Sequence, residues 1–557
     1  MRNSPPALYL VLISLLILSA GNEIVGQSAV PRFEPSVCAI PVPTNERNLQ
    51  CGYVVVLENR NAKNGKTIRL PIVILKSDNP HPKPDPVLRT LGGPGASSLK
   101  LIRGRRSSPW LKDRDMIIFE QRGTKFAQPA LECPEIDGAR NEGAKRRLDR
   151  RSGKTKEIAA AMVCYDRLTK QGIDLGAYNS RESAADIEDG RRALKLEKIN
   201  LYGVSYSARL MLEVMRDFPD SVRSVVLEST LPLEVNYDEV GVDGIVRSLN
   251  EMFARCRADA DCAVAYPDLE KEFYAVVDRL NEHPLTVSKN DPDTKASVDV
   301  LVDGDDFVTW IVDYLFSNEP AATVDAPFVT HQAFMGKYVD QFKRDGGPDL
   351  GGSFYSWGMR YSFWCSEEMP FESRKKIAAQ STKFSALRGY EVSALPDICK
   401  VWKVPPAKPI ENQPVRSDIP TLILTAEFDA YTPPAWGRST AVNLKNSFLF
   451  EIAWAGHGPG FSVPCVHDMV AAFIDDPSAR PDDDCIAKTS AKFKFLTAKP
   501  YDRFLFSHIA IAYTLNLQNS VLFGFGIHDE NICDLRCPTL LRCDSSPGVR
   551  SETGIRR

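Results

Sequence analysis

The sequence predicts an α/β fold with a mainly parallel central sheet, helices on both faces and a large, mostly helical insertion. Short runs rich in β-branched and aromatic residues alternate with stretches of helical periodicity up to about Pro232. The alternation then gives way to helix-rich, irregular sequence and returns with a buried strand after Ile419. Strands that alternate with helices are typical of a parallel sheet covered on both faces.

The predicted strands are short runs with the composition that suits a pleated, buried surface. They are Gly52–Leu57, Ile68–Leu75, Met116–Phe119, Ile199–Tyr202, Val222–Leu227, Thr421–Thr425 and Phe448–Ile452. Apolar residues at helical spacing predict helices at Glu182–Leu196, Ala208–Asp217, Asp238–Arg257, Leu269–Asn281 and Asp305–Phe316. Two polar stretches, the proline-rich Asp78–Val87 and the basic Arg140–Lys156, are interpreted as exposed loops.

These patterns divide the chain into five consecutive parts. We expect a signal peptide at 1–27, the first part of the core fold at 28–235, a cap-forming insertion at 236–410, the C-terminal part of the core at 411–490 and an atypical tail at 491–557. The tail does not continue the core pattern, since Phe504–Phe525 is apolar without clean amphipathicity and the last residues have the composition of a disordered segment.

The N-terminal segment has the pattern of a secretory signal peptide. An uncharged apolar run, Ala7–Ala20, follows Arg2. As a helix, these residues would rise about 21 Å, which is shorter than the roughly 30 Å hydrocarbon core of a bilayer. We therefore expect export to a secreted or periplasmic location and no stable membrane anchor.

Charge and cysteine content narrow the class of protein. The formal net charge of −3 gives no reason to expect a nucleic-acid partner. Seven scattered histidines give no sign of a metal site, and no motif indicates a cofactor. Thirteen cysteines agree with an oxidising compartment. Neighbour pairing, the simplest of the possible connectivities, joins Cys38 to Cys51, Cys133 to Cys164, Cys256 to Cys262, Cys365 to Cys399 and Cys465 to Cys485.

A serine stands in a small-residue turn between a predicted strand and a predicted helix. Residues 200–209 read N-L-Y-G-V-S-Y-S-A-R, with Ser205 at the turn. A serine hydroxyl needs a neighbouring base and an orienting acid to attack a carbonyl, and backbone N–H groups must face the developing oxyanion. A strand–turn–helix supplies part of this geometry. Ser205 is therefore the candidate nucleophile, with the Tyr206 N–H as an oxyanion donor.

The candidate acid and base follow two later strands. Asp429 comes directly after the strand Thr421–Thr425, at the end of a strand where active-site residues of open α/β sheets gather. His457 follows the strand Phe448–Ile452 in a glycine-flanked loop. Upstream, the sequence L-G-G-P-G beginning at Leu91 follows a hydrophobic approach. We expect this loop to supply the second oxyanion donor, at Gly93.

Five motifs in this order resemble those of one enzyme family. They are Leu91-Gly-Gly-Pro-Gly, Phe119-Glu-Gln-Arg-Gly-Thr, Gly203-Val-Ser-Tyr-Ser, Glu427-Phe-Asp-Ala-Tyr-Thr-Pro-Pro and Gly456-His-Gly. Together they resemble the secreted α/β-hydrolases, and within them the proline iminopeptidase and tripeptidyl aminopeptidase branch. The resemblance covers about residues 35–490, with a block at about 385–490 that is typical of tripeptidyl aminopeptidases. The chain order serine, aspartate, histidine is that of α/β-hydrolases.

The resemblance implies a serine exopeptidase that acts on short peptides from a free N-terminus through an acyl-enzyme on Ser205. His457 would exchange the proton and Asp429 would fix its tautomer. The insertion would roof the site as a cap. In this family acidic cap residues recognise the substrate α-amine, and Glu367 and Glu368 are the candidates here; a solvated acidic pair is the alternative.

Four positions depart from the family pattern. Glu120 stands where the family has aspartate, Lys125 and Phe126 replace small residues, and Ser207 replaces the second glycine of the turn. The extra atoms of Ser207 could crowd the turn. Two other functions remain open on the sequence alone: an esterase or lipase that uses the same three residues, and an inactive binding protein on a hydrolase scaffold.

Overall fold

The computed structural model describes residues 30–497, except for short gaps. The gaps are 43–47, 103–107, 146–149, 292–293, 318–319, 338–351, 353, 388–389, 391–394 and 462. All described residues belong to one compact unit. The predicted signal peptide and the predicted tail beyond residue 497 lie outside the described residues.

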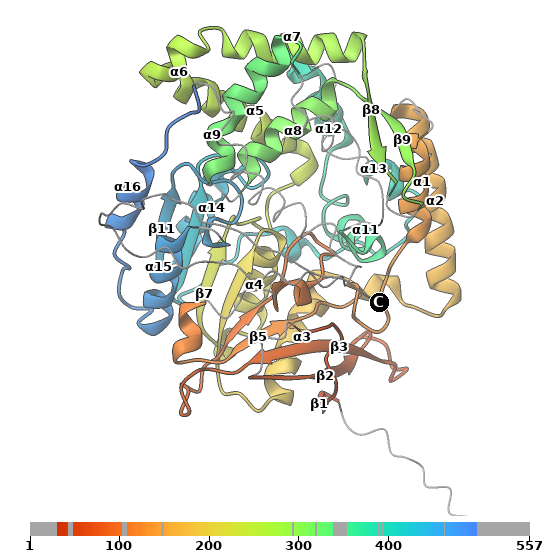
Figure 1. Cartoon of the computed structure of the whole chain (residues 1–557). Coiled ribbons are helices and arrows are strands. Elements are labelled where there is room, and N and C mark those ends of the chain that lie inside the picture. Colours follow the sequence, from red (N-terminus) through yellow and green to blue (C-terminus); the bar gives the residue numbers. More distant parts are fainter. Residues whose placement is uncertain are drawn as a thin grey trace, which may run out of the picture. The chain divides into compact units, whose positions relative to one another are not determined.

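A nine-stranded sheet forms the centre of the described structure (Figure 1). In spatial order its strands are β1 (Arg32–Pro35), β2 (Leu49–Leu57), β3 (Thr67–Leu75), β5 (Met116–Phe119), β4 (Val87–Arg89), β6 (Ile199–Val204), β7 (Val222–Glu228), β10 (Thr421–Ala426) and β11 (Ser447–Ile452). Neighbours from β1 to β5 pair antiparallel, and all neighbours from β5 to β11 pair parallel. The seven predicted strands are confirmed, and β1 and β4 are short additions.

Helices cover both faces of this sheet, as predicted. They are α3 (Ser180–Ala193), α4 (Tyr206–Asp217), α14 (Pro434–Asn443), α15 (Pro464–Asp475) and α16 (Asp484–Ser490). Apolar side chains of α3, α4 and α14 pack on one face, and those of α15 pack on the other. Strand β10 shows the consequence, because Ile423 joins the α4 side while Leu422 and Leu424 join the α15 side. Burial on both faces explains the uninterrupted apolar sequence of this strand.

A long insertion separates two adjacent strands of the sheet. Strand β7 ends at Glu228 and its parallel neighbour β10 begins at Thr421. Between them lie α5 (Tyr237–Ala258), α6 (Ala260–Ala265), α7 (Leu269–Glu282), β8 (Leu285–Asn290), β9 (Ser297–Val302), α8 (Gly304–Phe316), α9 (Pro320–Phe334), α11 (Trp357–Glu367), α12 (Arg374–Lys383) and α13 (Leu395–Ile398). Helices α5, α7, α8 and α9 share an apolar core, and they lie at the top of Figure 1. We call this insertion the cap.

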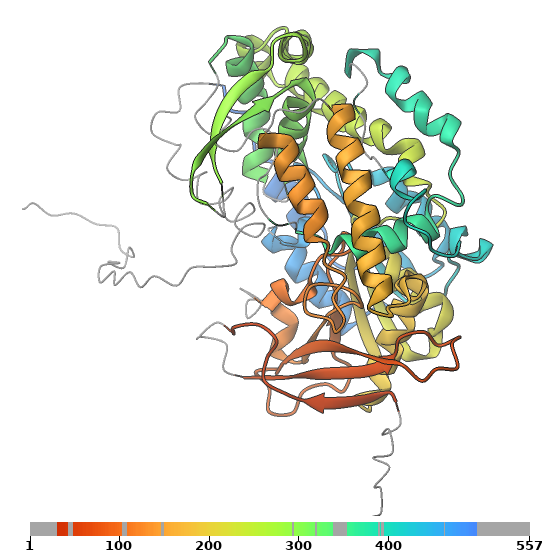
Figure 2. The same cartoon turned by 90° about the vertical axis from the view of Figure 1, so that its right-hand side faces the viewer.

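One reading of the sequence is wrong. The basic stretch Arg140–Lys156 is not an exposed loop, because it runs from α1 (Pro134–Lys145) into α2 (Arg150–Lys170). Figure 2 shows the two helices side by side, with their upper ends beside elements of the cap. Charged side chains link them, as in the ion pair between Lys156 and Glu142 at 3.0 Å. Polar residues dominate this stretch, and the apolar side chains that α2 buries, such as Ala161 and Leu168, come after it, so the stretch itself has no apolar stripe.

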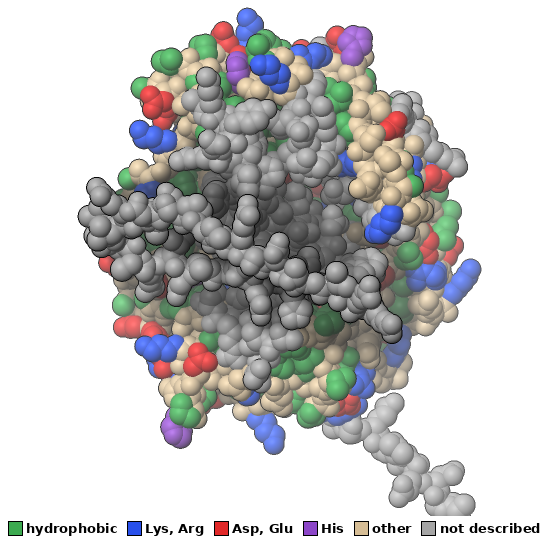
Figure 3. Space-filling model, viewed as in Figure 1, with side chains coloured by type: hydrophobic (Ala, Val, Ile, Leu, Met, Phe, Trp, Pro, Cys, Tyr) green, Lys and Arg blue, Asp and Glu red, His purple; other side chains and the backbone are tan. Residues whose placement is uncertain are grey.

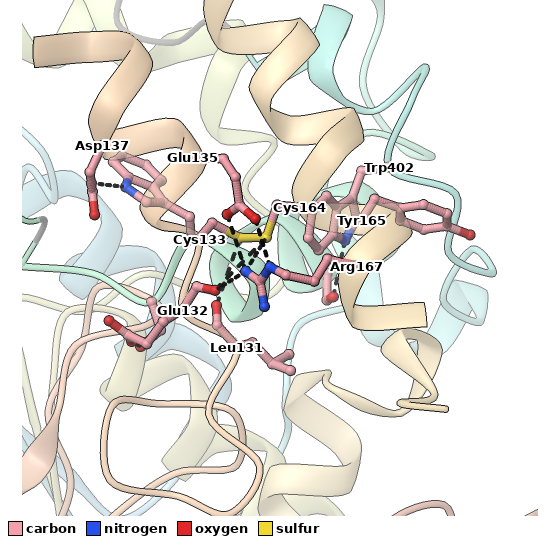
Figure 4. Close-up of a disulfide and its surroundings, with 12 residues drawn as sticks. Leu131, Glu132, Cys133, Glu135, Asp137, Cys164, Tyr165, Arg167 and Trp402 are labelled. Carbon is pink, nitrogen blue, oxygen red and sulfur yellow. Dashed lines mark hydrogen bonds and ion pairs between the residues drawn. A yellow bond between two sulfur atoms is a disulfide. The ribbon is translucent and has the colours of Figure 1, made fainter. Parts of the chain in front are cut away.

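A disulfide fastens α1 to α2 (Figure 4). Cys133 precedes α1 and Cys164 lies within α2. Beside the bridge, the Arg167 guanidinium donates to the Glu135 carboxylate at 2.6 Å and to the backbone oxygen of Glu132 at 2.7 Å. The bridge and the arginine therefore hold the start of α1 against the C-terminal part of α2.

The five predicted disulfide pairings are all confirmed. The bridges join Cys38 to Cys51, Cys133 to Cys164, Cys256 to Cys262, Cys365 to Cys399 and Cys465 to Cys485. In the part of the chain that the structure describes, no helix is both long and apolar enough to cross a bilayer. On the face drawn in Figure 3, basic and acidic side chains are interspersed around the rim, in keeping with the small net charge.

Candidate active site

Ser205 occupies a strained position between β6 and α4. Its backbone has φ 62° and ψ −129°, a region that residues other than glycine seldom adopt. The Ser205 N–H donates to the backbone oxygen of Glu228 at 3.0 Å, and its own carbonyl accepts from the Ala208 N–H at 2.9 Å. Such strain is characteristic of functional sites that the surrounding structure holds in place. The strand, tight turn and helix predicted around Ser205 are confirmed.

Two small residues make this turn possible. A Cβ on Gly203 would lie 2.4 Å from the backbone oxygen of Ser207, so any larger residue at 203 would collide. Ser207 itself is fully buried and does not crowd the turn. Its hydroxyl accepts from the Val204 N–H at 2.7 Å and lies 3.2 Å from the backbone oxygen of Thr90, to which it can donate. The departure from the family motif thus adds hydrogen bonds to the turn.

The glycine-rich loop after β4 lies against the turn. A Cβ on Gly92 would be 3.0 Å from the Ser205 Cβ and 3.2 Å from the Tyr206 backbone nitrogen. Gly93 has φ 121°, and its backbone oxygen accepts from the Arg360 guanidinium at 2.8 Å. The structure therefore brings together the loop, the serine and Tyr206. Gly92, which sequence reasoning did not single out, leaves no room for a side chain beside the serine.

Glu120 anchors this loop from the neighbouring strand β5. Its carboxylate is fully buried and accepts from the Ser97 hydroxyl at 3.0 Å, the Leu99 N–H at 3.1 Å and the Phe126 N–H at 3.3 Å. Burial raises the pKa of Glu120 despite these hydrogen bonds. Glu120 is one methylene longer than the aspartate of the family, and its carboxylate is held by these three hydrogen-bond donors from two loops.

Asp429 and His457 form a hydrogen-bonded pair. Asp429 is fully buried after β10, and its Oδ2 lies 2.8 Å from the His457 Nδ1. Its Oδ1 accepts from the backbone N–H groups of Tyr431 and Thr432 at 3.1 and 2.9 Å, and the Thr432 hydroxyl donates to Oδ2 at 2.6 Å. Burial opposes ionisation, but His457 and these donors outweigh it and hold the pKa of Asp429 below its ordinary value.

Two residues at the end of β7 hold the loop that carries His457 through hydrogen bonds. Ser229, directly after β7, accepts from the Gly458 N–H at 2.9 Å through its hydroxyl. The fully buried carboxylate of Glu228 accepts from the Gly460 N–H and, at 2.9 Å, from the Tyr202 hydroxyl. Burial raises the pKa of Glu228. Sequence reasoning missed both residues, although each stands at the end of a strand next to β6.

The three candidate residues lie at one edge of the sheet. Ser205, Asp429 and His457 follow the carboxyl ends of β6, β10 and β11, which are parallel strands of one region of the sheet. Because the His457 Nδ1 is hydrogen-bonded to Asp429, Nε2 is the ring nitrogen that can exchange a proton with a substrate or nucleophile. Among the described residues, no group of three or more His, Cys, Asp or Glu side chains is placed to hold a metal ion.

Glu367 and Glu368 lie at the end of α11 and are buried rather than solvated. The Arg209 guanidinium of α4 faces both, with its Nη1 3.0 Å from the Glu368 carboxylate and its Nε 3.8 Å from that of Glu367. The Ser180 N–H donates to Glu367 and the Tyr237 N–H donates to Glu368. Burial raises the pKa of each glutamate to about 7, against the attraction of Arg209.

Comparison with known proteins finds a matching family, related sequences and related structures. Residues 385–485 match a family described as TAP-like protein. The serine protease Hip1 of Mycobacterium tuberculosis is 24% identical over 391 residues, which cover 64% of this chain and 72% of that protein. The tripeptidyl aminopeptidase of Streptomyces lividans is 28% identical over 197 residues, 33% of this chain and 35% of that protein. The solved proline iminopeptidase of Mycobacterium smegmatis is 11% identical with a TM-score of 0.34, over 74% of this chain and 96% of that chain.

The fold, the site and the matched region agree. A mainly parallel sheet with helices on both faces carries Ser205 on a strained turn and an Asp429–His457 pair at the same edge. The TAP-like match includes Asp429 and His457. These findings support a serine hydrolase. The chain has the α/β-hydrolase fold and carries a TAP-like region at residues 385–485, as its motifs predict.

Proposed function

We propose that this chain is a serine aminopeptidase that hydrolyses short peptides from a free N-terminus. Ser205 is the nucleophile, His457 the general base and Asp429 the residue that orients it. The observation that carries the proposal is the Asp429–His457 hydrogen bond of 2.8 Å at the sheet edge where Ser205 sits in a strained turn. The names of the relatives, a serine protease and a tripeptidyl aminopeptidase, agree with this chemistry.

The reaction proceeds in two displacements. His457 Nε2 takes the proton of the Ser205 hydroxyl as Oγ attacks the peptide carbonyl, and the N–H groups of Tyr206 and Gly93 receive the oxyanion. The imidazolium then gives its proton to the leaving amine, and an acyl-enzyme ester remains on Ser205. A water molecule, deprotonated by His457, hydrolyses this ester and restores the free serine. Asp429 stays ionised throughout and stabilises the imidazolium.

Recognition of the free amine is assigned to the two buried glutamates of the cap. A single arginine, Arg209, faces both Glu367 and Glu368. When both carboxylates are ionised, the group therefore carries an uncompensated negative charge, which a substrate ammonium can neutralise. An N-acylated substrate has no such charge. Selectivity for free N-termini over blocked ones follows from this difference.

Export is part of the proposal. Five disulfides lie in the described residues, and such bonds form and persist in oxidising compartments. The predicted signal peptide at 1–27 would direct the chain there. Mass spectrometry of the secreted form would report the mature N-terminus directly.

A substrate panel on the purified mature protein tests the activity. Aminoacyl- and tripeptidyl-nitroanilides are compared in free and N-acetylated form, beside p-nitrophenyl esters, with Ser205→Ala as the inactive control. We expect the free peptides to be cleaved about 10- to 100-fold faster than the acetylated ones, since a charged hydrogen bond contributes about 1.5–3 kcal/mol. Glu368→Gln should raise KM for the free peptides more than for the acetylated ones.

Each alternative has its own signature in this panel. Equal cleavage of free and acetylated peptides would sink the aminopeptidase proposal. Turnover of esters alone would identify an esterase that uses the same residues. Failure of a fluorophosphonate to label Ser205, with no turnover of any substrate, would identify an inactive scaffold.

A further inference from the structure

The last turn of cap helix α8 lies directly on the loop of the candidate base. The His457 N–H donates to the backbone oxygen of Phe316 at 2.7 Å, and the Gly456 N–H donates to that of Ser317 at 3.0 Å. A Cβ on Gly456 would lie 2.3 Å from the backbone oxygen of Leu315. The cap and the histidine loop therefore approach as closely as two backbones can.

The Phe316 side chain contacts the loops of both the acid and the base. Its ring stacks on the His457 imidazole with centroids 4.5 Å apart and planes 19° apart. The same ring meets the Tyr431 ring edge to face, with centroids 4.8 Å apart. The Tyr431 N–H in turn donates to Asp429. One phenyl group from the cap thus packs against the loop of the candidate acid after β10 and the loop of the candidate base after β11.

We propose that Phe316 is a positioning residue for the catalytic base, and that α8 makes the cap part of the catalytic machinery. This inference rests on the proposed role of His457. A ring stacked on the imidazole restricts its rotation, and the proposed proton exchange with Ser205 requires a fixed direction of Nε2. The face of a phenyl ring also attracts the imidazolium that forms when His457 takes the serine proton. The C-terminal end of α8 adds a partial negative charge on the same side.

A comparison of three variants tests this role in the full-length protein. Phe316→Leu keeps an apolar side chain but removes the ring, and Phe316→Tyr keeps the ring. Phe307→Leu makes the same change in the same helix, at a fully buried position that packs on Phe273 in the cap core. The readouts are the rate of fluorophosphonate labelling, kcat and KM for a free peptide nitroanilide, and the thermal unfolding midpoint.

Loss of the ring should affect the chemical step more than binding. We expect Phe316→Leu to lower kcat and the labelling rate about tenfold, with KM changed less than about twofold, because a partly desolvated cation–π contact is worth roughly one factor of ten. Phe316→Tyr should stay within about threefold of the wild type, by the same reasoning. Phe307→Leu should lower the unfolding midpoint and leave kcat close to that of the wild type.

Three results would overturn the inference while leaving the proposed function intact. The first is a Phe316→Leu variant that fluorophosphonate labels at the wild-type rate. The second is a Phe316→Tyr variant that loses as much kcat as Phe316→Leu. The third is a Phe307→Leu variant that loses as much kcat as Phe316→Leu, which would trace the effect to cap stability. A wild-type protein that is neither labelled nor active would instead remove the proposed function, and this inference with it.

Discussion

The Ser207 hydroxyl acts as an internal brace of the turn that carries Ser205. It accepts from the buried Val204 N–H at 2.7 Å and reaches the backbone of the β4 end at Thr90. We expect Ser207→Ala to lower the free energy of unfolding by about 1–2 kcal/mol, because a buried donor loses its partner. Urea denaturation measures this loss, with the exposed Ser439→Ala on α14 as a matched control expected to change stability by less than about 0.5 kcal/mol.

Replacing Ser207 by glycine, the residue of the family motif, tests whether the serine stabilises the turn or is only tolerated there. Ser207→Gly removes the hydroxyl and adds backbone freedom inside α4, so it should be less stable than Ser207→Ala, by up to about 1 kcal/mol. If serine were only tolerated at this position, the glycine variant would match or exceed the wild type in stability. That outcome would show that the hydrogen bonds of Ser207 contribute nothing net.

Single residues differ in how far the sequence can predict their roles. Ser205, Asp429 and His457 each follow a recognisable strand, and their order along the chain matches a known pattern. Glu228 and Gly92 contact the same site, but only because β7 and β4 are the neighbours of β6 in the sheet. Strand order is set by tertiary packing, and no local sequence pattern records it.

The contact between helices α4 and α11 makes the stability of the protein depend on pH. Burial raises the pKa of Glu368 to about 7, whereas a glutamate in an unfolded chain titrates near its ordinary value of about 4.3. Between these two pH values the folded state holds a proton that the unfolded state has lost. Unfolding is therefore favoured as the pH rises through this window, and the contribution of Glu368 to stability is lost by about pH 7.

Glu368→Gln should weaken the pH dependence of the free energy of unfolding. We expect the wild type to lose on the order of 2 kcal/mol more than Glu368→Gln between pH 4.5 and pH 7.5, as judged by urea denaturation across that range. The exposed Glu282→Gln at the end of α7 serves as the control and should follow the wild type. Parallel curves for the wild type and Glu368→Gln would contradict the raised pKa.

At the scale of elements, the sequence predicts those that carry an apolar stripe. Helix α7 buries one apolar face, and α4 is buried over most of its length with apolar residues at most positions, so both patterns are visible in the sequence. The stretch Arg140–Lys156, where α1 passes into α2, is polar, and the buried apolar residues of the two helices, such as Ile136 and Leu168, lie outside it. No apolar stripe therefore marks this stretch as helical. The hairpin of β8 and β9 has alternating apolar residues on both sides of a polar turn, a pattern that is easily overlooked within a helix-rich region.

At the scale of the whole molecule, the insertion could be predicted and its placement could not. The strand pattern stops after β7 and returns at β10, which marks an interruption of one sheet. Where the cap rests depends on contacts such as that of Phe316 with His457, which join positions far apart in the chain. Such contacts depend on the folded shapes of the cap and of the core, and neither segment has a sequence pattern that predicts which residues it will contact.

The disulfides close loops of different lengths, and two of them allow a controlled comparison of what each contributes to stability. Cys133–Cys164 closes a loop with a sequence separation of 31, and Cys256–Cys262 one of 6, while all four cysteines are almost fully buried. Because burial is matched, replacing either pair by alanine removes similar packing. Loop-closure entropy predicts that losing the longer loop costs about 1.5 kcal/mol more. Urea denaturation of the two double-alanine variants measures the difference, and an equal or greater loss for the short loop would show that strain or packing, rather than chain entropy, sets the contribution of these bridges.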